Sequence, residues 1–201
     1  MITHNLFPTA ASFFALGRDL TEQESAFLCG QEQKPNSGNT TSAARTLLDD
    51  PILADLRSFI DASVSEYFQT IYSPKHDVKL RITQSWTNYT KPGQYHHKHA
   101  HPNSLISGVF YVKSNKDTDR IFFFNDGYEQ IKLSVKDWNI YNSESWWLPV
   151  GTGDLVIFPS SFTHMVQSVE GDAERVSLAF NTFPVGYVGD EDNLTGLHLK
   201  D

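Results

Sequence analysis

Apolar residues recur at two different spacings along the chain, and the spacing changes near Pro74. Before it, apolar residues in the 52–71 segment return every three or four positions, which predicts a helix with one buried face. Those residues are Ile52, Leu53, Leu56, Phe59, Ile60, Val64, Tyr67, Phe68 and Ile71. After Pro74, short apolar runs are separated by Gly, Asn, Asp and Pro, which is typical of strands and turns. The expected strands cover 79–89, 104–112, 121–124, 131–135, 154–158 and 175–180.

Helices followed by strands predict an α+β, mainly β domain, with the strands in a sandwich or a barrel and the helix packed on a sheet. Near the start, Thr21 and Glu24 have capping-box spacing, so a short helix is expected from Glu22 to Gly30. Residues 3–15 are expected to be extended, with Phe7-Pro8 and Phe13-Phe14 as anchors. Residues 31–42 are polar and are expected to form a surface loop.

The 201 residues fit one domain, and 39% apolar content is typical of a globular chain. We expect a helical part over about 1–75, a core over about 78–185 and a peripheral tail over 186–201. A net charge of −8 disfavours nucleic acid and anionic membrane as partners. Cys29, the single cysteine, excludes an intrachain disulfide. No signal peptide or membrane-spanning run is recognisable, so a soluble, cytoplasmic protein is expected.

The most distinctive segment is 95–102, Tyr-His-His-Lys-His-Ala-His-Pro. Imidazole is a common ligand for iron, zinc, copper and nickel. In an extended segment, alternate side chains point to the same side. His97, His99 and His101 are therefore expected to face one way and His96 the other. The alternative is a histidine-rich loop that traps metal without doing chemistry.

Two further blocks follow. Residues 153–164 read as a Gly-Asp turn, an apolar strand and a loop that ends in His164. In the 175–181 block, alternation places Arg175 and Ser177 on one face of a short apolar strand. An arginine there needs a partner, because an unpaired buried charge is costly. That partner is either a nearby acid, such as Glu174 or Asp172, or the carboxylate of a ligand.

Taken in order, these blocks resemble the Fe(II)- and 2-oxoglutarate-dependent oxygenases. The resemblance is strongest to a bacterial and phage subgroup with a His-x-His-Pro…Ser-Gly-x-x-Tyr pattern. The matching residues are His99-Ala100-His101-Pro102, Ser107-Gly108-Val109-Phe110-Tyr111, Phe158-Pro159-Ser160 with His164, and Arg175 to Asn181. The resemblance covers residues 80–183 well and implies a double-stranded β-helix (jelly-roll) core with the N-terminal helices on one sheet.

The resemblance also implies roles for individual residues. His99 corresponds to the first metal ligand and His164 to the distal histidine. Arg175 and Ser177 would hold the distal carboxylate of 2-oxoglutarate, and Tyr111 would add a hydrogen bond to it. The implied cofactors are Fe(II), 2-oxoglutarate and O2. The implied reaction is hydroxylation of a C–H bond with release of succinate and CO2.

The chain departs from the general pattern at His101, where most of these enzymes have a carboxylate. His97 is a rival ligand, since it shares the alternation of His99 and His101. Two alternatives follow from a three-histidine set. One is a cupin-like dioxygenase that does not use 2-oxoglutarate, and the other is a non-catalytic metal-binding jelly-roll module.

The residues flanking the histidines are candidates for a substrate pocket or for ordinary packing: Trp86, Asn88, Tyr95 and Asn103. A second aromatic group lies within 136–150: Trp138, Tyr141, Trp146 and Trp147. These side chains are expected either to cover the mouth of the barrel or to form a homodimer face. The substrate, whether a small molecule or a protein, is left open by the sequence.

Overall fold

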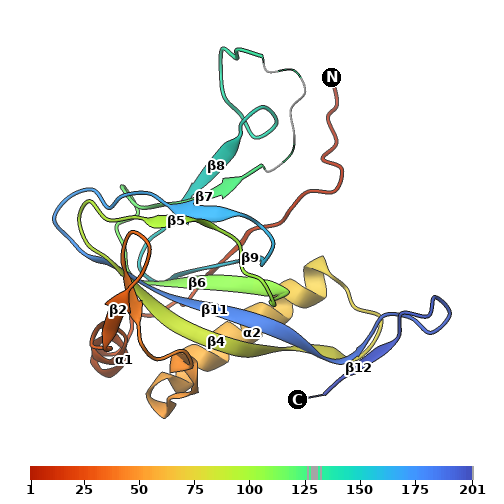
Figure 1. Ribbon diagram of the computed structural model, residues 1–201, viewed down its shortest axis with the longest axis horizontal. Helices are drawn as coiled ribbons and strands as arrows, with labels where there is room; N and C mark the ends of the chain where they lie inside the picture. The colour runs from red at the N-terminus through yellow and green to blue at the C-terminus, as the bar shows by residue number, and fades with distance from the viewer. Residues whose placement is uncertain (126, 128–130, 132, 201) are drawn as a thin grey trace.

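Two antiparallel sheets face each other, and one is much larger than the other (Figure 1). The computed structural model describes residues 1–125, 127, 131 and 133–200. The large sheet has the order β1-β9-β6-β11-β4-β3-β2, with β12 paired to β11. The small sheet has the order β5-β10-β7-β8. This two-sheet arrangement is the jelly-roll core expected from the sequence.

The elements of the first half are β1 (Ser12–Ala15), α1 (Glu22–Cys29), β2 (Gln33–Pro35), β3 (Thr40–Ser42), the 3-10 turns η1 (Leu47–Asp49) and η2 (Pro51–Leu53), α2 (Ala54–Ile71), β4 (Val78–Thr90) and β5 (His96–His99). Those of the second half are β6 (Ile106–Lys113), β7 (Arg120–Phe124), β8 (Ser145–Pro149), β9 (Asp154–Pro159), β10 (His164–Val166), β11 (Arg175–Val188) and β12 (Leu197–Leu199). The expected strands at 79–89, 104–112, 121–124, 154–158 and 175–180 are thus confirmed.

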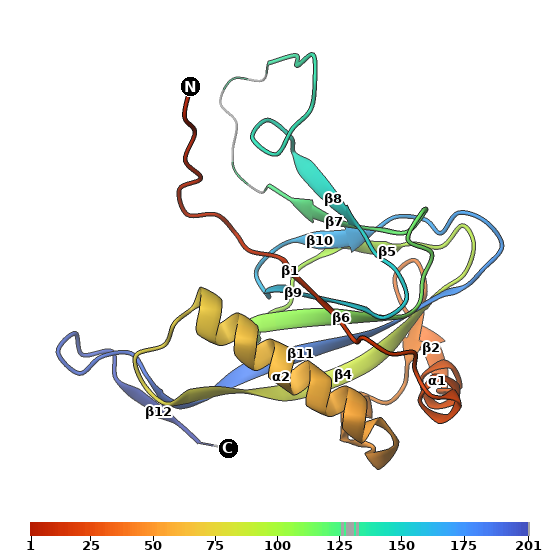
Figure 2. The same cartoon turned by 180° about the vertical axis from the view of Figure 1, so that it is seen from behind.

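Alternation along the strands gives the large sheet two different buried faces. On β11, Val176, Leu178 and Phe180 join the core under α2, which crosses the outer face of the sheet (Figure 2). On β9, Val156 and Phe158 belong to a second cluster between the two sheets. The odd-numbered residues of β11 from 175 to 181 therefore lie on its inner face, toward the space between the sheets.

The short helix α1 forms as expected. Its N-cap Thr21 accepts a hydrogen bond from the Glu24 amide, and the Glu24 carboxylate accepts one from the Thr21 amide. Among the helices of the described residues, none is long and apolar enough to cross a membrane.

Three local expectations were wrong. Residues 31–42 form the β2–β3 hairpin, which extends the large sheet beside β4 instead of lying in a loop. Residues 131 and 133–135 are not a strand, and residue 132 lies outside the described residues. Of the expected anchors, Phe14 packs against the core, but Phe7 is exposed, because the N-terminal segment extends away from the body alongside the β7–β8 hairpin (Figures 1 and 2).

Candidate metal centre

Three histidines from different segments meet between the sheets. His99 ends β5 and His164 begins β10, and the two residues are direct partners in the antiparallel pairing. Their ring centroids lie 4.4 Å apart. His101 follows just beyond β5, with its ring 5.1 Å from that of His164. One nitrogen from each of the three rings lies within 4.8 Å of the other two. Strand pairing therefore brings together residues that are far apart in the sequence.

Backbone carbonyl groups orient two of these rings. The Nδ1 of His99 lies 2.7 Å from the carbonyl oxygen of His97. The Nδ1 of His164 lies 3.0 Å from the carbonyl oxygen of Phe162. A carbonyl oxygen only accepts, so Nδ1 carries the proton in both rings and Nε2 keeps its lone pair. Hydrogen bonding of this kind on the far side of the ring is the usual support of a metal-bound histidine.

A side chain orients the third ring. The Nδ1 of His101 lies 2.7 Å from Oδ1 of Asn181 on β11, which also accepts a hydrogen bond from the Ser107 hydroxyl at 2.8 Å. The Ser107 hydroxyl in turn lies 2.7 Å from that of Ser160. The Ser160 carbonyl accepts the His101 amide at 2.8 Å. The serines of two sequence blocks thus form one buried network that holds His101.

The spacing of the free nitrogens fits a bound metal ion. Nε2 of His99 and Nε2 of His101 are 3.1 Å apart. In the tautomers set by the Nδ1 contacts, both are acceptors, so no proton lies between them and their lone pairs repel. A cation bound by both, at the usual metal–nitrogen distance of about 2.0–2.1 Å, removes that conflict. The donor set therefore fits a transition metal held by imidazole.

Burial keeps these rings neutral. It lowers the pKa of His101 to about 4 and that of His164 to about 3, with the neighbouring His99 acting in the same direction. Burial also lowers the pKa of His99. Only neutral imidazole binds a metal, so at neutral pH protons do not compete for the three nitrogens.

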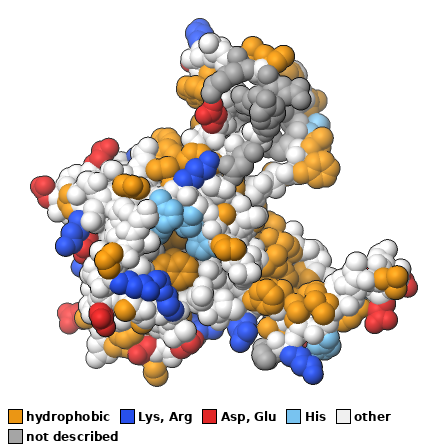
Figure 3. Space-filling view, viewed as in Figure 1, with side chains coloured by type: hydrophobic (Ala, Val, Ile, Leu, Met, Phe, Trp, Pro, Cys, Tyr) orange, Lys and Arg blue, Asp and Glu red, His pale blue; other side chains and the backbone are white. Residues whose placement is uncertain are grey.

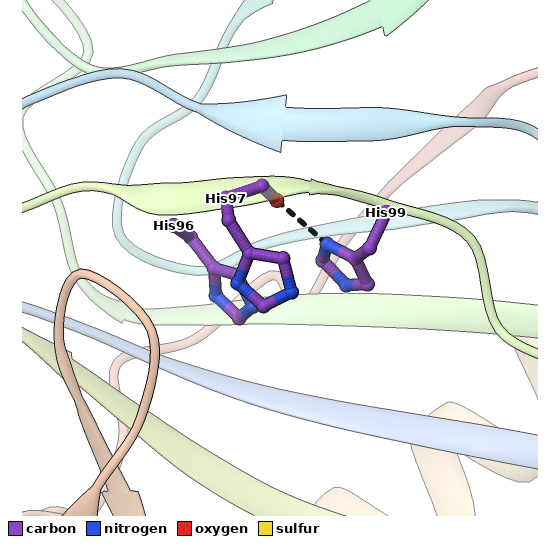
Figure 4. Close-up of side chains that lie close together, drawn as sticks. All are labelled: His96, His97 and His99. Atoms are coloured by element: carbon purple, nitrogen blue, oxygen red, sulfur yellow. Dashed lines mark hydrogen bonds between the residues drawn. The ribbon is translucent and has the colours of Figure 1, made fainter.

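The expectation for His96 was wrong. Its partner across the small sheet is Val166, while His99 pairs with His164, so β5 has one residue more than β10 over this stretch. This β-bulge breaks the alternation. As a result, His96 and His97 lie on the same side of β5 as His99 (Figure 4). His97 is not part of the group formed by His99, His101 and His164.

Arg175 is buried, and it has an internal partner. Its Nη1 donates to Oδ1 of Asp119 at 3.0 Å, and its Nη2 lies 3.4 Å from the carbonyl oxygen of Gln167. Both members of the ion pair are almost fully buried. Neither Glu174 nor Asp172 is the partner, because Asp119 reaches the interior from the turn before β7. The guanidinium thus contacts Gln167, which follows His164 by only three residues in the sequence.

Beside Arg175, the inner face of the large sheet carries a polar row. Ser177 on β11 pairs with Tyr111 on β6 and with Asn88 on β4. The Tyr111 hydroxyl and the Asn88 Oδ1 are buried, and neither has a hydrogen-bond partner within the described part of the chain. A buried polar group without a partner is costly, and such groups commonly mark a binding site. The row has the polarity required to bind a small carboxylate next to Arg175.

The candidate pocket residues divide into two groups. Trp86 stacks on His101, with ring centroids 5.8 Å apart, and Asn88 belongs to the polar row. Tyr95 is exposed, and its backbone pairs with Gly38 of the β2–β3 hairpin. Asn103 is an exposed turn residue with a φ of 58°. Trp86 and Asn88 therefore lie at the site, whereas the side chains of Tyr95 and Asn103 are exposed to solvent.

The second aromatic group is away from the histidines. Trp138, Tyr141, Trp146 and Trp147 are all exposed on or before β8. Tyr141 and Trp146 line a groove of about 910 Å³ between the β7–β8 hairpin and residues 4–9. None of the three clustered histidines lines this groove. Tyr141 and Trp146 thus line a groove that is separate from the three clustered histidines.

Sequence reasoning missed two residues of the site. Asn181 lies in the matching 175–181 block, and its alternation with Arg175 and Ser177 places it on the inner face, but the sequence pattern indicates no role for it. Asp119 carried no recognisable signal, since it lies in a turn between strands. Asp119 and Arg175 are 56 residues apart in the sequence, and only the fold brings them into contact.

Comparison with known proteins identifies the family of this domain. Residues 84–181 match the family model described as "Putative 2OG-Fe(II) oxygenase", and this domain belongs to the Fe(II)/2-oxoglutarate oxygenases. The chain is thus an oxidoreductase whose cofactors are Fe(II), 2-oxoglutarate and O2. The matched range includes His99, His101, His164 and Arg175. A search of curated protein sequences found no match.

Solved structures share the fold at low identity. A 2OG-Fe(II) oxygenase family oxidoreductase from Burkholderia pseudomallei has 15% identity and a TM-score of 0.55, covering 80% of this chain and 78% of its own. A Pseudomonas putida prolyl-4-hydroxylase has 14% identity and a TM-score of 0.53, covering 87% and 92%. HygX from Streptomyces hygroscopicus, with nickel, 2-oxoglutarate and hygromycin B bound, has 11% identity and a TM-score of 0.58, covering 96% and 92%.

Proposed function

We propose that this protein hydroxylates a C–H bond of its substrate, with oxidation of 2-oxoglutarate to succinate and CO2. The metal would be held by the Nε2 atoms of His99, His101 and His164. The observation that supports this most strongly is the pair of acceptor nitrogens 3.1 Å apart, both oriented by hydrogen bonds at Nδ1.

When bound, Fe(II) and 2-oxoglutarate supply the oxidising chemistry of the family. The chain's own residues bind and orient these cofactors. Arg175 and the Tyr111 hydroxyl would bind the distal carboxylate of 2-oxoglutarate, with Ser177 between them on β11. Asp119 holds the Arg175 guanidinium in place by accepting one of its five N–H groups, which leaves others for the ligand. The buried walls around this pair limit the access of water.

The three-histidine set has a physical consequence of its own. A ligand set of three neutral imidazoles leaves the metal one charge unit more positive than a set of two histidines and a carboxylate. The row of Arg175, Ser177 and Tyr111 beside it is what a 2-oxoglutarate enzyme requires. A cupin-like dioxygenase without that co-substrate has no need of such a row, and neither has a non-catalytic module.

The experiment begins with metal-free protein reconstituted with Fe(II) and 2-oxoglutarate under anaerobic conditions. On exposure to air, we expect succinate to form, slowly without substrate and faster with the correct one. Peptidyl proline, other protein side chains, small metabolites and nucleobases form the first substrate panel. A metal-loaded protein that neither binds 2-oxoglutarate nor forms succinate would contradict the proposal.

The carboxylate site needs a double variant. Arg175→Ala alone would leave Asp119 as an unpaired buried charge, which costs about 3–5 kcal/mol and can unfold the chain. Arg175→Gln combined with Asp119→Asn removes both charges together. With redox-inert Ni(II) in the site, we expect this variant to bind 2-oxoglutarate at least about tenfold more weakly by calorimetry. Arg81→Gln, at an exposed position on β4, is the matched control and should bind normally.

A further inference from the structure

His96 and His97 form a second histidine group with His99, outside the set assigned to the catalytic metal. A nitrogen from each of these rings lies within 4.8 Å of the other two. The ring centroids of His96 and His99 are 4.7 Å apart, and those of His97 and His99 are 4.8 Å apart. Figure 4 shows the three rings side by side on one side of β5.

The β-bulge creates this group. With regular alternation, His96 would point away from His97 and His99. The extra residue of β5 opposite β10 brings all three side chains to the same side. The rings are half-buried, and Figure 3 shows histidine side chains at the centre of this face, open to solvent. An ion can therefore reach the group directly from solution.

Within this group, His97 is held only loosely. Its Nδ1 lies 3.4 Å from the carbonyl oxygen of Ser37, at the limit of a hydrogen bond. Small rotations of His96 and His97 can therefore close the group around an ion. Imidazole ligands at this spacing suit borderline divalent ions such as Zn2+, Co2+ and Ni2+.

We infer that His96, His97 and His99 form a second binding position for a divalent transition metal, and that it excludes metal from the catalytic position. The exclusion follows from His99, because its Nδ1 donates to the His97 carbonyl and only Nε2 remains to bind an ion. A single lone pair binds a single ion. Metal at the outer position thus withdraws His99 from His101 and His164. The inhibitory meaning of this exclusion depends on the proposed function, but the binding itself does not.

Metal binding by variants of the full chain tests this directly. Zn2+ is titrated by calorimetry into metal-free His101→Ala protein, which lacks the catalytic triad but keeps the outer group. We expect one Zn2+ per chain. Adding His96→Gln and His97→Gln to this variant should weaken Zn2+ binding at least about tenfold, while adding His198→Gln in the exposed tail should change nothing. Equal binding by the two multiple variants would overturn the inference. Should His101→Ala not fold, His101→Asn takes its place.

Exclusion is tested on the wild-type chain with Co2+, whose absorption spectrum reports its ligands. We expect one Co2+ per chain in total, and two bound ions would overturn the shared role of His99. His99→Ala should lose both positions. Succinate formation by Fe(II)-loaded wild-type protein is measured separately. Absence of succinate with the zinc results intact would defeat the proposed hydroxylase function alone and leave the outer metal position standing.

Discussion

Asn181 shows how one side chain can set the geometry of a candidate metal ligand. Its Oδ1 accepts from both His101 and Ser107, so it fixes the tautomer and the rotation of the His101 ring. Asn181→Leu keeps the volume but removes the acceptor. In a His96→Gln, His97→Gln background, which leaves only the group of His99, His101 and His164, we expect this change to weaken Co2+ binding about 10–100-fold, as is usual when the outer partner of a metal-bound histidine is lost.

Asn181→Asp is the control for that change, because a carboxylate still accepts from His101 and Ser107. It should retain most of the affinity. Affinities are measured by competition with a chromophoric chelator. If Asn181→Leu left the Co2+ affinity of this background unchanged, Nδ1 orientation would not contribute to this centre.

The Tyr111 hydroxyl makes a second residue-scale test possible. It is buried without a partner among the described residues, so removing it costs the folded protein no hydrogen bond. A hydrogen bond to a ligand carboxylate contributes about 1.5–3 kcal/mol. Tyr111→Phe is therefore expected to raise the KM for 2-oxoglutarate about tenfold or more, while the melting temperature stays the same or rises.

Tyr89→Phe is the matched control for Tyr111. The Tyr89 hydroxyl is also buried, but it donates to the Leu28 carbonyl at 2.6 Å and accepts from Thr87 at 2.8 Å. That variant should lose about 1 kcal/mol of stability with an unchanged KM. Stability loss in Tyr111→Phe with an unchanged KM would assign its hydroxyl a structural role instead.

At the scale of elements, Gly108 shows why β6 carries a glycine in the middle of a buried strand. A Cβ at this position would lie against the Phe180 ring, 2.6 Å from Cε1. Gly108→Ala should therefore destabilise the protein by about 1–3 kcal/mol. Adding Phe180→Leu should recover part of the loss, giving a coupling of about 0.5–3 kcal/mol in urea unfolding. Strictly additive effects would show that the two positions do not compete for space.

The Glu24 carboxylate holds the start of helix α1 in place, and its negative charge contributes to the stability of the fold. Arg18 donates two hydrogen bonds to Glu24, at 2.8 and 2.7 Å, and these lower the Glu24 pKa from 4.5 to about 2. A pKa lower in the folded state than in the unfolded state stabilises the fold above pH 4.5, and this contribution is lost as pH falls toward 2. Arg18 is partly exposed, so solvent screening limits the effect to about 1–2 kcal/mol at pH 7.

Glu24→Gln isolates this charge, because glutamine can still complete the capping box. We expect the stability difference between wild type and variant to be largest at pH 7 and to shrink between pH 4.5 and pH 2. Urea unfolding at several pH values measures it. A stability difference that did not change with pH would mean that packing, and not the charge of Glu24, causes it.

The elements also show how far the sequence could predict this fold. Capping-box spacing predicted α1, and alternation predicted both faces of β11, because each depends on neighbouring residues only. The bulge in β5 depends on how that strand pairs with β10, so alternation alone misplaced His96. The β2–β3 hairpin escaped prediction for a similar reason. Its polar residues pair with β4, which is far away in the sequence.

At the scale of the whole molecule, the convergence of His99 with His164 is a property of topology. Nothing in the local pattern around either residue indicates that β5 and β10 are neighbours; only the family resemblance suggested it. The partner of Arg175 was even less accessible to prediction. Asp119 precedes β7, and its approach to β11 requires both sheets to be in place. Local chemistry predicted the candidate ligands, whereas the sheets determine how these side chains are oriented and paired.

The same topology predicts that metal stabilises the entire fold. An ion held by His99, His101 and His164 joins the neighbouring strands β5 and β10 of the small sheet and, through the His101–Asn181 contact, connects them to β11 of the large sheet. At a free metal concentration 100 times the Kd, this linkage contributes about 2.7 kcal/mol. For a chain of this size, that corresponds to an increase in melting temperature of about 5–11 °C. Differential scanning fluorimetry with Co2+ should show the increase in wild type and not in His99→Ala, which lacks a ligand common to both metal positions. An equal increase in His99→Ala would mean that the stabilising ion binds elsewhere on the protein.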